Sequence, residues 1–125
     1  AGVAHRATRA SVDYALVRQQ FGHPIAEFQA IQFMVADSQT AAEAARLMAL
    51  SSASQSDLAT AARALSAAAT AARTAADTAV QVHGGAGYTR DYPAESLLRD
   101  ASLLKQVATH RFTTTALPPF ANPVV

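Results

Sequence analysis

The sequence predicts an all-α fold, specifically an up-and-down four-helix bundle. Apolar residues recur at three- and four-residue steps in four segments, no segment shows the alternating pattern of a strand, and glycine- or proline-containing breaks separate the segments. A chain of 125 residues is long enough for one core but not for two. We therefore expect one bundle over residues 1–117, followed by an extended, proline-containing tail over residues 118–125.

The first expected helix begins at the amino end of the chain. It ends before Phe21-Gly22-His23-Pro24, where Gly22 favours the left-handed cap conformation and Pro24 cannot continue a helix. No initiator methionine, signal-like segment or capping residue precedes it, so we interpret the chain as a fragment of a longer parent with further domains upstream. The expected apolar stripe comprises Val3, Ala4, Ala7, Ala10, Tyr14 and Val17.

The second and third expected helices are separated by the serine-rich stretch 51–56. The third helix, Leu58–Val82, is dominated by alanine and has Asp57 or Ser56 as its expected cap. It is either low-complexity helix or a central bundle helix packed on several sides, and we favour the central helix. The buried stripe of the second helix is expected at Phe28, Ile31, Phe33, Met34, Ala41, Ala45, Met48 and Ala49.

The fourth expected helix follows the break at His83-Gly84-Gly85-Ala86-Gly87 and begins near Tyr92-Pro93, because proline is favoured in the first turn. The run from Phe112 to Leu117 extends it in our prediction, and Pro118-Pro119 end it. Its apolar stripe is expected at Leu97, Leu98, Ala101, Leu104 and Val107.

Composition excludes several classes of function. A net charge of +1 with scattered arginines disfavours nucleic-acid binding, and no apolar stretch is long enough for membrane insertion. The chain has no cysteine, which rules out disulfides and thiolate sites. The four histidines lack the paired spacing of a metal site, and no nucleophile elbow supports hydrolysis, so we expect no metal site.

Two features are candidates for ligand binding on local grounds. The glycines from Gly84 to Gly87 follow a helix, which excludes a Rossmann fingerprint and a P-loop. They form either a helix cap with a tight turn or a loop whose bare backbone approaches a phosphate. Arg18 is either a solvated side chain or a guanidinium fork for a pyrophosphate.

Four motifs in register resemble a known family: Asp13 to Gly22, Phe28 to Met34, Gln81 to Thr89, and Tyr92-Pro93 followed by Leu97 to Ala101. Together they are similar to the C-terminal domain of acyl-CoA dehydrogenases, over most of the chain from Gly2 to about Val107. The resemblance implies a four-helix bundle that packs against two upstream domains of the same polypeptide. It also implies homo- or hetero-oligomers, usually dimers of dimers, with FAD bound across a subunit boundary.

The resemblance assigns cofactor contacts residue by residue. The Arg-x-x-Phe-Gly and Gln-x-x-Gly-Gly motifs, with a glutamine at the start of the second helix, imply contacts to the diphosphate and adenosine side of a flavin held mainly by the neighbouring subunit. A guanidinium, amides and exposed backbone donors suit a diphosphate. The implied cofactor-binding residues are Arg18, Phe21, Gln29, Gln81, Gly84 and Gly85.

The catalytic base of the family is missing from its usual place. The resemblance puts a glutamate eight residues after the aspartate of Arg-Asp-Ala, where this chain has Ala108, so no catalytic residue is assigned. Some family members carry the glutamate on the first helix, upstream of the residue matching Gly2. His110 lies two positions past the expected site, and we do not propose it as a substitute base.

The leading prediction is that the parent is a bacterial, cytoplasmic, FAD-dependent acyl-CoA dehydrogenase that desaturates an acyl-CoA thioester between its alpha and beta carbons. This chain then supplies cofactor contacts and subunit packing, and is inactive alone. The alternatives are a non-catalytic partner subunit of a heteromeric dehydrogenase and a purely structural helical assembly domain. Because such a bundle leaves apolar faces uncovered, we expect the isolated chain to self-associate.

Overall fold

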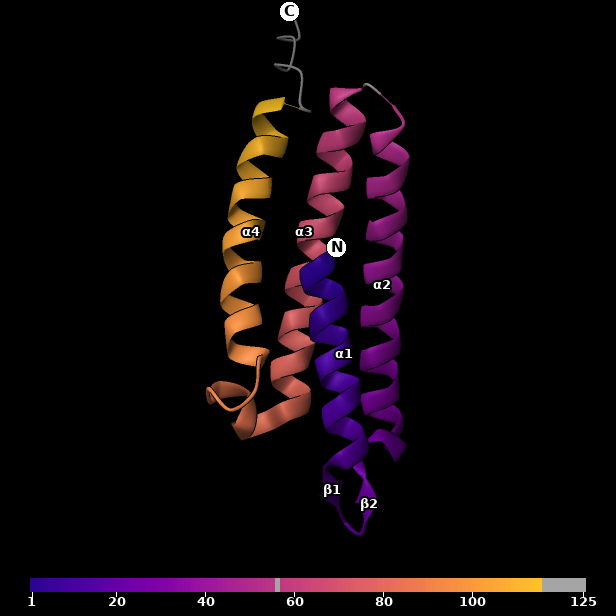
Figure 1. Cartoon of the computed structure of the whole chain (residues 1–125), viewed down its shortest axis with the longest axis vertical. Helices are drawn as coiled ribbons and strands as arrows, with labels where there is room; N and C mark the ends of the chain where they lie inside the picture. Colours follow the sequence, from indigo (N-terminus) through magenta and orange to yellow (C-terminus); the bar gives the residue numbers. More distant parts are fainter. Residues whose placement is uncertain (56, 116–125) are drawn as a thin grey trace, which may run out of the picture.

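The computed structural model describes residues 1–55 and 57–115, and the possible cap Ser56 and the expected tail lie outside these ranges. Four long helices run alternately up and down the molecule (Figure 1). This confirms the predicted all-α four-helix fold, and α4 includes residues 112–115 as expected. The helices are α1 (Gly2–Val17), α2 (Gln29–Ala53), α3 (Leu58–His83) and α4 (Ala94–Thr115).

The alanine-rich α3 is the centre of the bundle. It packs against α1, α2 and α4, and Figure 1 shows α2 and α4 on opposite sides of it. Ala75, Ala76 and Ala79 are fully buried, and the main hydrophobic cluster gathers alanines from all four helices. Small side chains let helix axes approach closely, so the alanines form the core rather than a filler segment. The central-helix interpretation is confirmed.

The ends of α3 are fixed by a carboxylate and a glycine. Asp57 caps the first turn, where its carboxylate accepts hydrogen bonds from the backbone N–H groups of Ala59 at 3.2 Å and Thr60 at 2.8 Å. The Thr60 hydroxyl also donates to Asp57, and this bond, followed by the two backbone bonds, lowers the pKa of the carboxyl. At the other end Gly84 has a φ of +57°, a left-handed value that glycine adopts without strain.

The buried face of α1 includes two polar residues that the apolar pattern omitted. Thr8 and Ser11 are buried because each hydroxyl donates to the carbonyl oxygen four residues earlier, Thr8 to Ala4 and Ser11 to Ala7, both at 3.0 Å. The predictions for Ala4, Ala7 and Tyr14 are confirmed. The prediction for Val17 is wrong, because this last residue of α1 extends past the packed part of the bundle into solvent.

The predicted stripe of α2 is confirmed in part, because Ala45 is buried and Ile31 and Ala41 pack against the hydrophobic clusters. Phe33 and Met48 are exposed, because the face that meets the other helices consists of small residues, which permit closer packing than large ones. In α4 the predictions for Leu97 and Ala101 are confirmed, whereas Leu104 and Val107 are exposed. The buried residues of α2 are Ser38, Ala42 and Ala45.

The link between α1 and α2 contains a small hairpin that the sequence did not predict. Strand β1 (Gln19–Gln20) pairs antiparallel with β2 (His23–Pro24), and a 3-10 turn, η1 (Ile25–Glu27), leads into α2. Phe21 and Gly22 have φ values of +54° and +84°, as a two-residue hairpin turn requires. Gly22 is therefore left-handed as expected, but it serves a hairpin turn rather than a helix cap.

Candidate functional site

Three segments distant in sequence meet at the lower end of the bundle in Figure 1: the end of α1 with its hairpin, the end of α3, and the 3-10 turn η2 (Gly84–Tyr88). A groove of about 380 Å³ lies between them. The structure thus brings Arg18 together with Gly84 and Gly85. The groove is lined by Tyr14, Arg18, Gln20, Ile25, Val82, His83, Gly84, Gly85 and Ala86.

Arg18 is held by its backbone while its side chain stays available. Its N–H donates to the carbonyl oxygen of Tyr14 at 2.9 Å, and its own carbonyl accepts from the N–H of Ile25 at 2.8 Å. These two bonds fix the residue at the neck of the hairpin. The guanidinium is exposed and has no hydrogen-bond or ion-pair partner within residues 1–55 and 57–115. It is free to bind an anion in the groove.

The glycines of η2 are there for different reasons. A Cβ on Gly87 would lie 2.8 Å from the carbonyl oxygen of Val80, so the close approach of η2 to α3 requires glycine there. A Cβ on Gly85 would meet nothing within 4 Å, and its φ is not left-handed. Neither the packing nor the backbone of this chain requires glycine at position 85. A bare backbone there instead leaves room for a molecule in the groove.

An aromatic stack forms one wall of the groove. The rings of Tyr14 and His83 stack with centroids 4.2 Å apart, and Tyr92 contacts both edge-on at 5.1 Å. Nδ1 of His83 donates to the carbonyl oxygen of Ala79 at 2.7 Å, because a carbonyl can only accept. The sequence analysis did not foresee this stack. Its one signal was the position of Tyr14 on the predicted buried face.

The other predicted cofactor residues lie outside the groove lining. Phe21 is at the hairpin tip with its ring 6.4 Å from that of Phe28, and Gln29 is the first residue of α2. Gln81 lies in the last turn of α3, where its carbonyl accepts from the N–H of Gly84. All three predicted residues are exposed.

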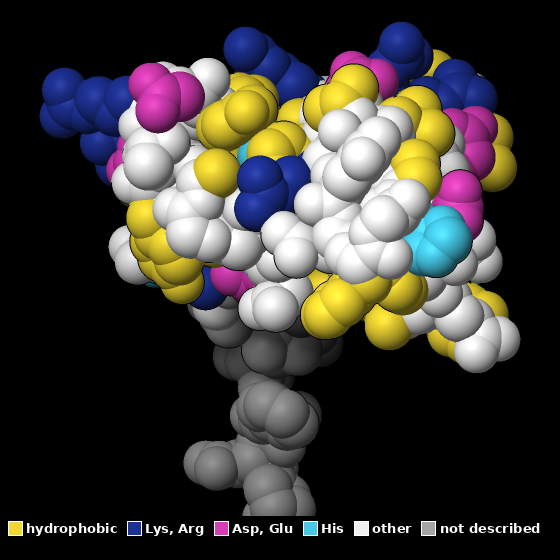
Figure 2. All heavy atoms as spheres, turned by 90° about the horizontal axis from the view of Figure 1, so that it is seen from below, with side chains coloured by type: hydrophobic (Ala, Val, Ile, Leu, Met, Phe, Trp, Pro, Cys, Tyr) yellow, Lys and Arg dark blue, Asp and Glu magenta, His cyan; other side chains and the backbone are white. Residues whose placement is uncertain are grey.

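Figure 2 shows this end of the molecule, where basic and apolar side chains lie beside one another. The cofactor roles stay predictions.

The position expected for the catalytic base is buried among apolar residues. Ala108 is 1% exposed and lines a second groove of about 320 Å³ between the amino end of α1 and helices α3 and α4. Among the described residues, no acidic side chain lines this groove, and His110 is exposed farther along α4. The groove is lined by Ala1, Gly2, Val3, Leu65, Ala68, Ala69, Ala72, Leu104, Val107 and Ala108.

Within residues 1–55 and 57–115, no three histidine, aspartate or glutamate side chains are placed to hold a metal ion. No helix in the same ranges combines the length and the hydropathy needed to cross a membrane.

Comparison with known proteins identifies the family to which the chain belongs. The profile of the family described as "Acyl-CoA dehydrogenase, C-terminal domain" matches residues 1–107. The chain belongs to the acyl-CoA dehydrogenase family. It is 46% identical over 107 residues to an acyl-CoA dehydrogenase of Bacillus subtilis, covering 82% of this chain and 28% of the relative. It is 44% identical over 106 residues to the 3-sulfinopropanoyl-CoA desulfinase of Paraburkholderia xenovorans, covering 82% of this chain and 27% of the relative.

A solved structure from this family has the same fold as the chain. The structure of glutaryl-coenzyme A dehydrogenase in complex with glutaryl-CoA superimposes with a TM-score of 0.85 at 31% identity, over 90% of this chain and 31% of that one. The chain thus corresponds to less than a third of the length of these acyl-CoA dehydrogenase family members. The part it corresponds to is the C-terminal helical domain.

Proposed function

We propose that this chain is the flavin-contacting and subunit-assembling domain of an FAD-dependent acyl-CoA dehydrogenase, an oxidoreductase that forms a double bond between the alpha and beta carbons of an acyl-CoA thioester. One observation carries the proposal. The free guanidinium of Arg18 and the open space over Gly85 share one groove, although nothing in the packing of the chain requires glycine at 85. A basic fork beside bare backbone suits the diphosphate of a dinucleotide.

Residues in the groove and around it fit FAD in three ways. Arg18 offers two parallel N–H donors to the diphosphate, and its anchored backbone limits the freedom lost on binding. Gly84 and Gly85 allow close approach, while Phe21, Gln29 and Gln81 provide exposed ring and amide groups around the same end of the bundle. FAD, when bound, supplies the acceptor for the hydride that leaves the beta carbon. The family resemblance implies that a neighbouring subunit would hold most of this cofactor, and this supports our proposal of an oligomer such as a dimer of dimers.

The base that removes the alpha proton is proposed to come from outside this chain. Alanine has no group that takes a proton, and none of the described residues that line the groove at Ala108 is acidic. The first turn of α1 lines the same groove, so a glutamate on a helical segment preceding Gly2 would reach the space beside Ala108. This geometry supports the arrangement in which the family carries its glutamate on the first helix. It also gives no role to His110.

The first experiment uses the full-length bacterial protein, which we propose to be cytoplasmic. The purified protein is examined for a flavin absorption spectrum and is then mixed, without oxygen, with a panel of acyl-CoA thioesters. We expect bound flavin and bleaching by at least one thioester. Bound flavin that no thioester bleaches would instead support a non-catalytic partner subunit. Absence of flavin would contradict the roles of Arg18 and Gly85 and favour a purely structural domain.

A second candidate activity is favoured by Ala108 together with one relative. The relative from Paraburkholderia xenovorans is named a 3-sulfinopropanoyl-CoA desulfinase. Desulfination would be a net hydrolysis, in which the bond between carbon 3 and sulfur breaks, carbon 3 takes a proton, and water supplies the oxygen that releases the sulfur as sulfite. This reaction removes no alpha proton, so it needs no base at position 108. The thioester panel therefore includes 3-sulfinopropanoyl-CoA. Release of sulfite without bleaching of the flavin would assign desulfination, and bleaching by a simple acyl-CoA without sulfite would assign desaturation.

A further inference from the structure

A further groove, of about 430 Å³, shares Tyr14 and His83 with the groove at Arg18. It lies between α1, the last residue of α3 and the two residues that precede α4. We call it the α1–α4 groove. The flavin role proposed above leaves this groove without a ligand.

Two buried side chains in the α1–α4 groove carry polar atoms that no described residue binds. Tyr14 and His83 are 9% and 4% exposed, and their rings stack. Within residues 1–55 and 57–115, no group bonds to the hydroxyl of Tyr14 or to Nε2 of His83. Burying a polar group without a hydrogen bond is costly, so two such groups in one groove indicate a place where a ligand binds.

The three rings at this wall offer both donors and an acceptor. Nδ1 of His83 donates to the carbonyl oxygen of Ala79, so Nε2 of the neutral ring can only accept. The hydroxyl of Tyr14 can donate, and so can that of Tyr92, which also lines the groove and is not bonded to any described residue. A ligand that satisfies this wall must therefore both accept and donate hydrogen bonds.

An unpaired arginine gives the groove a positive charge. Arg6 lies two helical turns before Tyr14 on α1, lines the groove and is exposed. In the part of the chain that the structure describes, its guanidinium has no hydrogen-bond or ion-pair partner. The groove also contains Arg9 and Asp13, but these pair with each other at 3.0 Å and cancel. The uncompensated charge of Arg6 favours an anion.

The start of α4 adds partial positive charge beside the groove. Pro93 lines the groove, and its carbonyl accepts from the N–H of Leu97, so the helix begins directly after it. The first N–H groups of a helix lack partners inside the helix, and its amino end attracts anions. The acid of this first turn, Glu95, pairs with Arg99 at 3.4 Å and does not line the groove.

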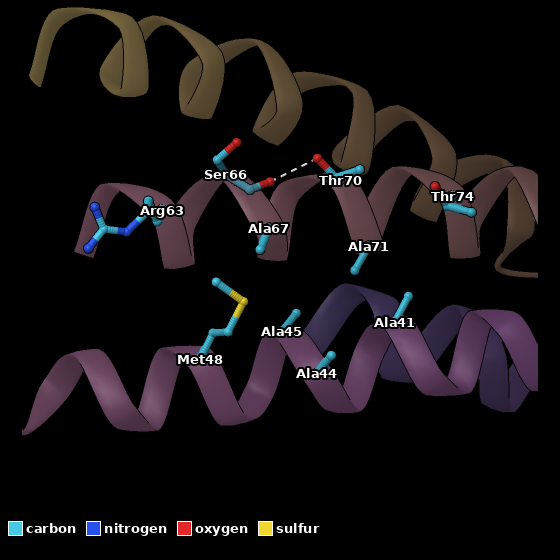
Figure 3. Close-up of a pocket in the computed structure, with 10 residues that line it drawn as sticks. All are labelled: Ala41, Ala44, Ala45, Met48, Arg63, Ser66, Ala67, Thr70, Ala71 and Thr74. Carbon is cyan, nitrogen blue, oxygen red and sulfur yellow. Dashed lines mark hydrogen bonds between the residues drawn. The ribbon is translucent and has the colours of Figure 1, made fainter. Parts of the chain in front are cut away.

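The larger groove between α2 and α3 lacks a comparable set of groups. It has a volume of about 510 Å³, and Figure 3 shows the hydroxyl of Thr70 bonded to the backbone of Ser66 beside the small side chain of Ala67. Its arginine, Arg63, already donates to the hydroxyl of Thr60 at 2.8 Å. Polar groups that are bonded within the chain need no ligand, which distinguishes this groove from the α1–α4 groove.

We infer that the α1–α4 groove binds a free phosphate ion. The phosphate oxygens accept hydrogen bonds from Arg6, Tyr14 and Tyr92, and a P–OH group donates to Nε2 of His83. Inorganic phosphate keeps a P–OH group at neutral pH, whereas sulfate has none. A phosphate monoester has largely lost its last P–OH proton, because its second pKa is about 6. The acceptor at His83 therefore favours the free ion over both.

The test is isothermal titration calorimetry of the full-length protein, as purified, with inorganic phosphate in a buffer free of other oxyanions. Arg6→Gln should raise the dissociation constant by about tenfold or more, because it removes charge-assisted hydrogen bonds. Tyr92→Phe removes one hydroxyl and should raise it by about two- to tenfold. Both side chains are exposed, so each variant should keep the helical circular dichroism of the parent.

Two arginine variants serve as matched controls. Arg90→Gln removes the same charge from an exposed residue that does not line the groove, and should leave the dissociation constant within about twofold. Arg18→Gln alters the flavin groove and should likewise keep phosphate binding. Binding that is lost in Arg18→Gln but kept in Arg6→Gln would place the ion in the flavin groove and overturn the inference.

Two further ligands test the role of the acceptor. Sulfate, which has the same shape without a P–OH group, should bind about tenfold more weakly or worse, and so should the monoester glycerol 1-phosphate. Equal binding of sulfate would contradict the hydrogen bond to Nε2, and tighter binding of the monoester would contradict the free ion. If the parent protein shows no saturable binding of phosphate, the site itself is refuted.

Discussion

Replacing Gly85 with alanine separates a ligand-binding role of this glycine from a structural one. A Cβ at position 85 meets no atom within 4 Å, and the backbone there is not left-handed, so the fold accommodates the methyl group. Exchange of glycine for alanine at a compatible position stabilises a protein by about 0.4–1 kcal/mol, because the unfolded chain loses conformational freedom. Gly85→Ala should therefore leave the free energy of unfolding unchanged or slightly higher.

The same methyl group is expected to weaken flavin binding. It projects into the space beside Arg18 in which we place the diphosphate. Losing one hydrogen bond between a backbone N–H group and a charged acceptor costs about 1.5–3 kcal/mol. That loss corresponds to a roughly 10- to 150-fold higher dissociation constant. The assay is a titration of the flavin-free, full-length protein with FAD, in which quenching of the flavin fluorescence measures binding.

Gly87→Ala is the matched control in the same turn. Its Cβ would lie 2.8 Å from the carbonyl oxygen of Val80, so the turn must shift, and overpacking of this kind costs about 1–3 kcal/mol of stability. The two variants should thus show opposite signatures, with lost affinity at position 85 and lost stability at position 87. An FAD dissociation constant for Gly85→Ala within about twofold of the parent would refute the reasoning from open space to ligand.

Three further perturbations test the remaining features. Arg18→Lys keeps the charge but removes the guanidinium fork, so FAD affinity should fall by about tenfold in the same titration, and an unchanged affinity would leave Arg18 as a solvated residue. Ala76→Leu inserts a large side chain into the centre of the bundle and should lower the unfolding free energy in urea by about 1–3 kcal/mol; a neutral result would contradict close packing of α3. The pKa of the Asp57 carboxyl is lowered in the folded state, mainly by the hydrogen bond from the Thr60 hydroxyl, so its stabilising effect is present above the ordinary pKa of 3.8 and lost as the pH falls through the lower folded value. Asp57→Asn caps the helix without titrating, so urea midpoints measured between about pH 5 and pH 2 should fall less steeply than in the parent.

The fold was largely predictable because its signals are local. Helix periods, the break before Pro24 and the cap at Asp57 each act within a few residues, and they located all four helices. The buried face of α2 was only partly predictable by the same logic, which assigned Ala45 to it correctly and missed Ser38 and Ala42. Large apolar residues were assigned to the core, although in an alanine-rich bundle small residues such as Ala42 mark the interior. Which face a helix buries depends on the size of the residues across from it, and that information lies in another helix.

The site was predictable only in part for a similar reason. Resemblance supplied Arg18, Gly84 and Gly85, and the structure brings the three to one groove, but no local pattern joins residues so far apart in sequence. The hairpin that positions Arg18 is too short to show an alternating pattern. The burial of His83 depends on Tyr14 and Tyr92, which come from other segments. These are consequences of tertiary packing.

Two features are not explained by packing among the described residues: the bare backbone of Gly85 and the open groove beside Ala108. Gly85 lies in η2 at the lower end of the bundle, and the groove lies between the amino end of α1 and helices α3 and α4. An alanine core brings four helices close together but leaves few large side chains to fill the surrounding space. Under the proposed function, the room left at Gly85 and beside Ala108 is filled from beyond the bundle, by a flavin at Gly85 and by an adjoining segment that carries the base at Ala108.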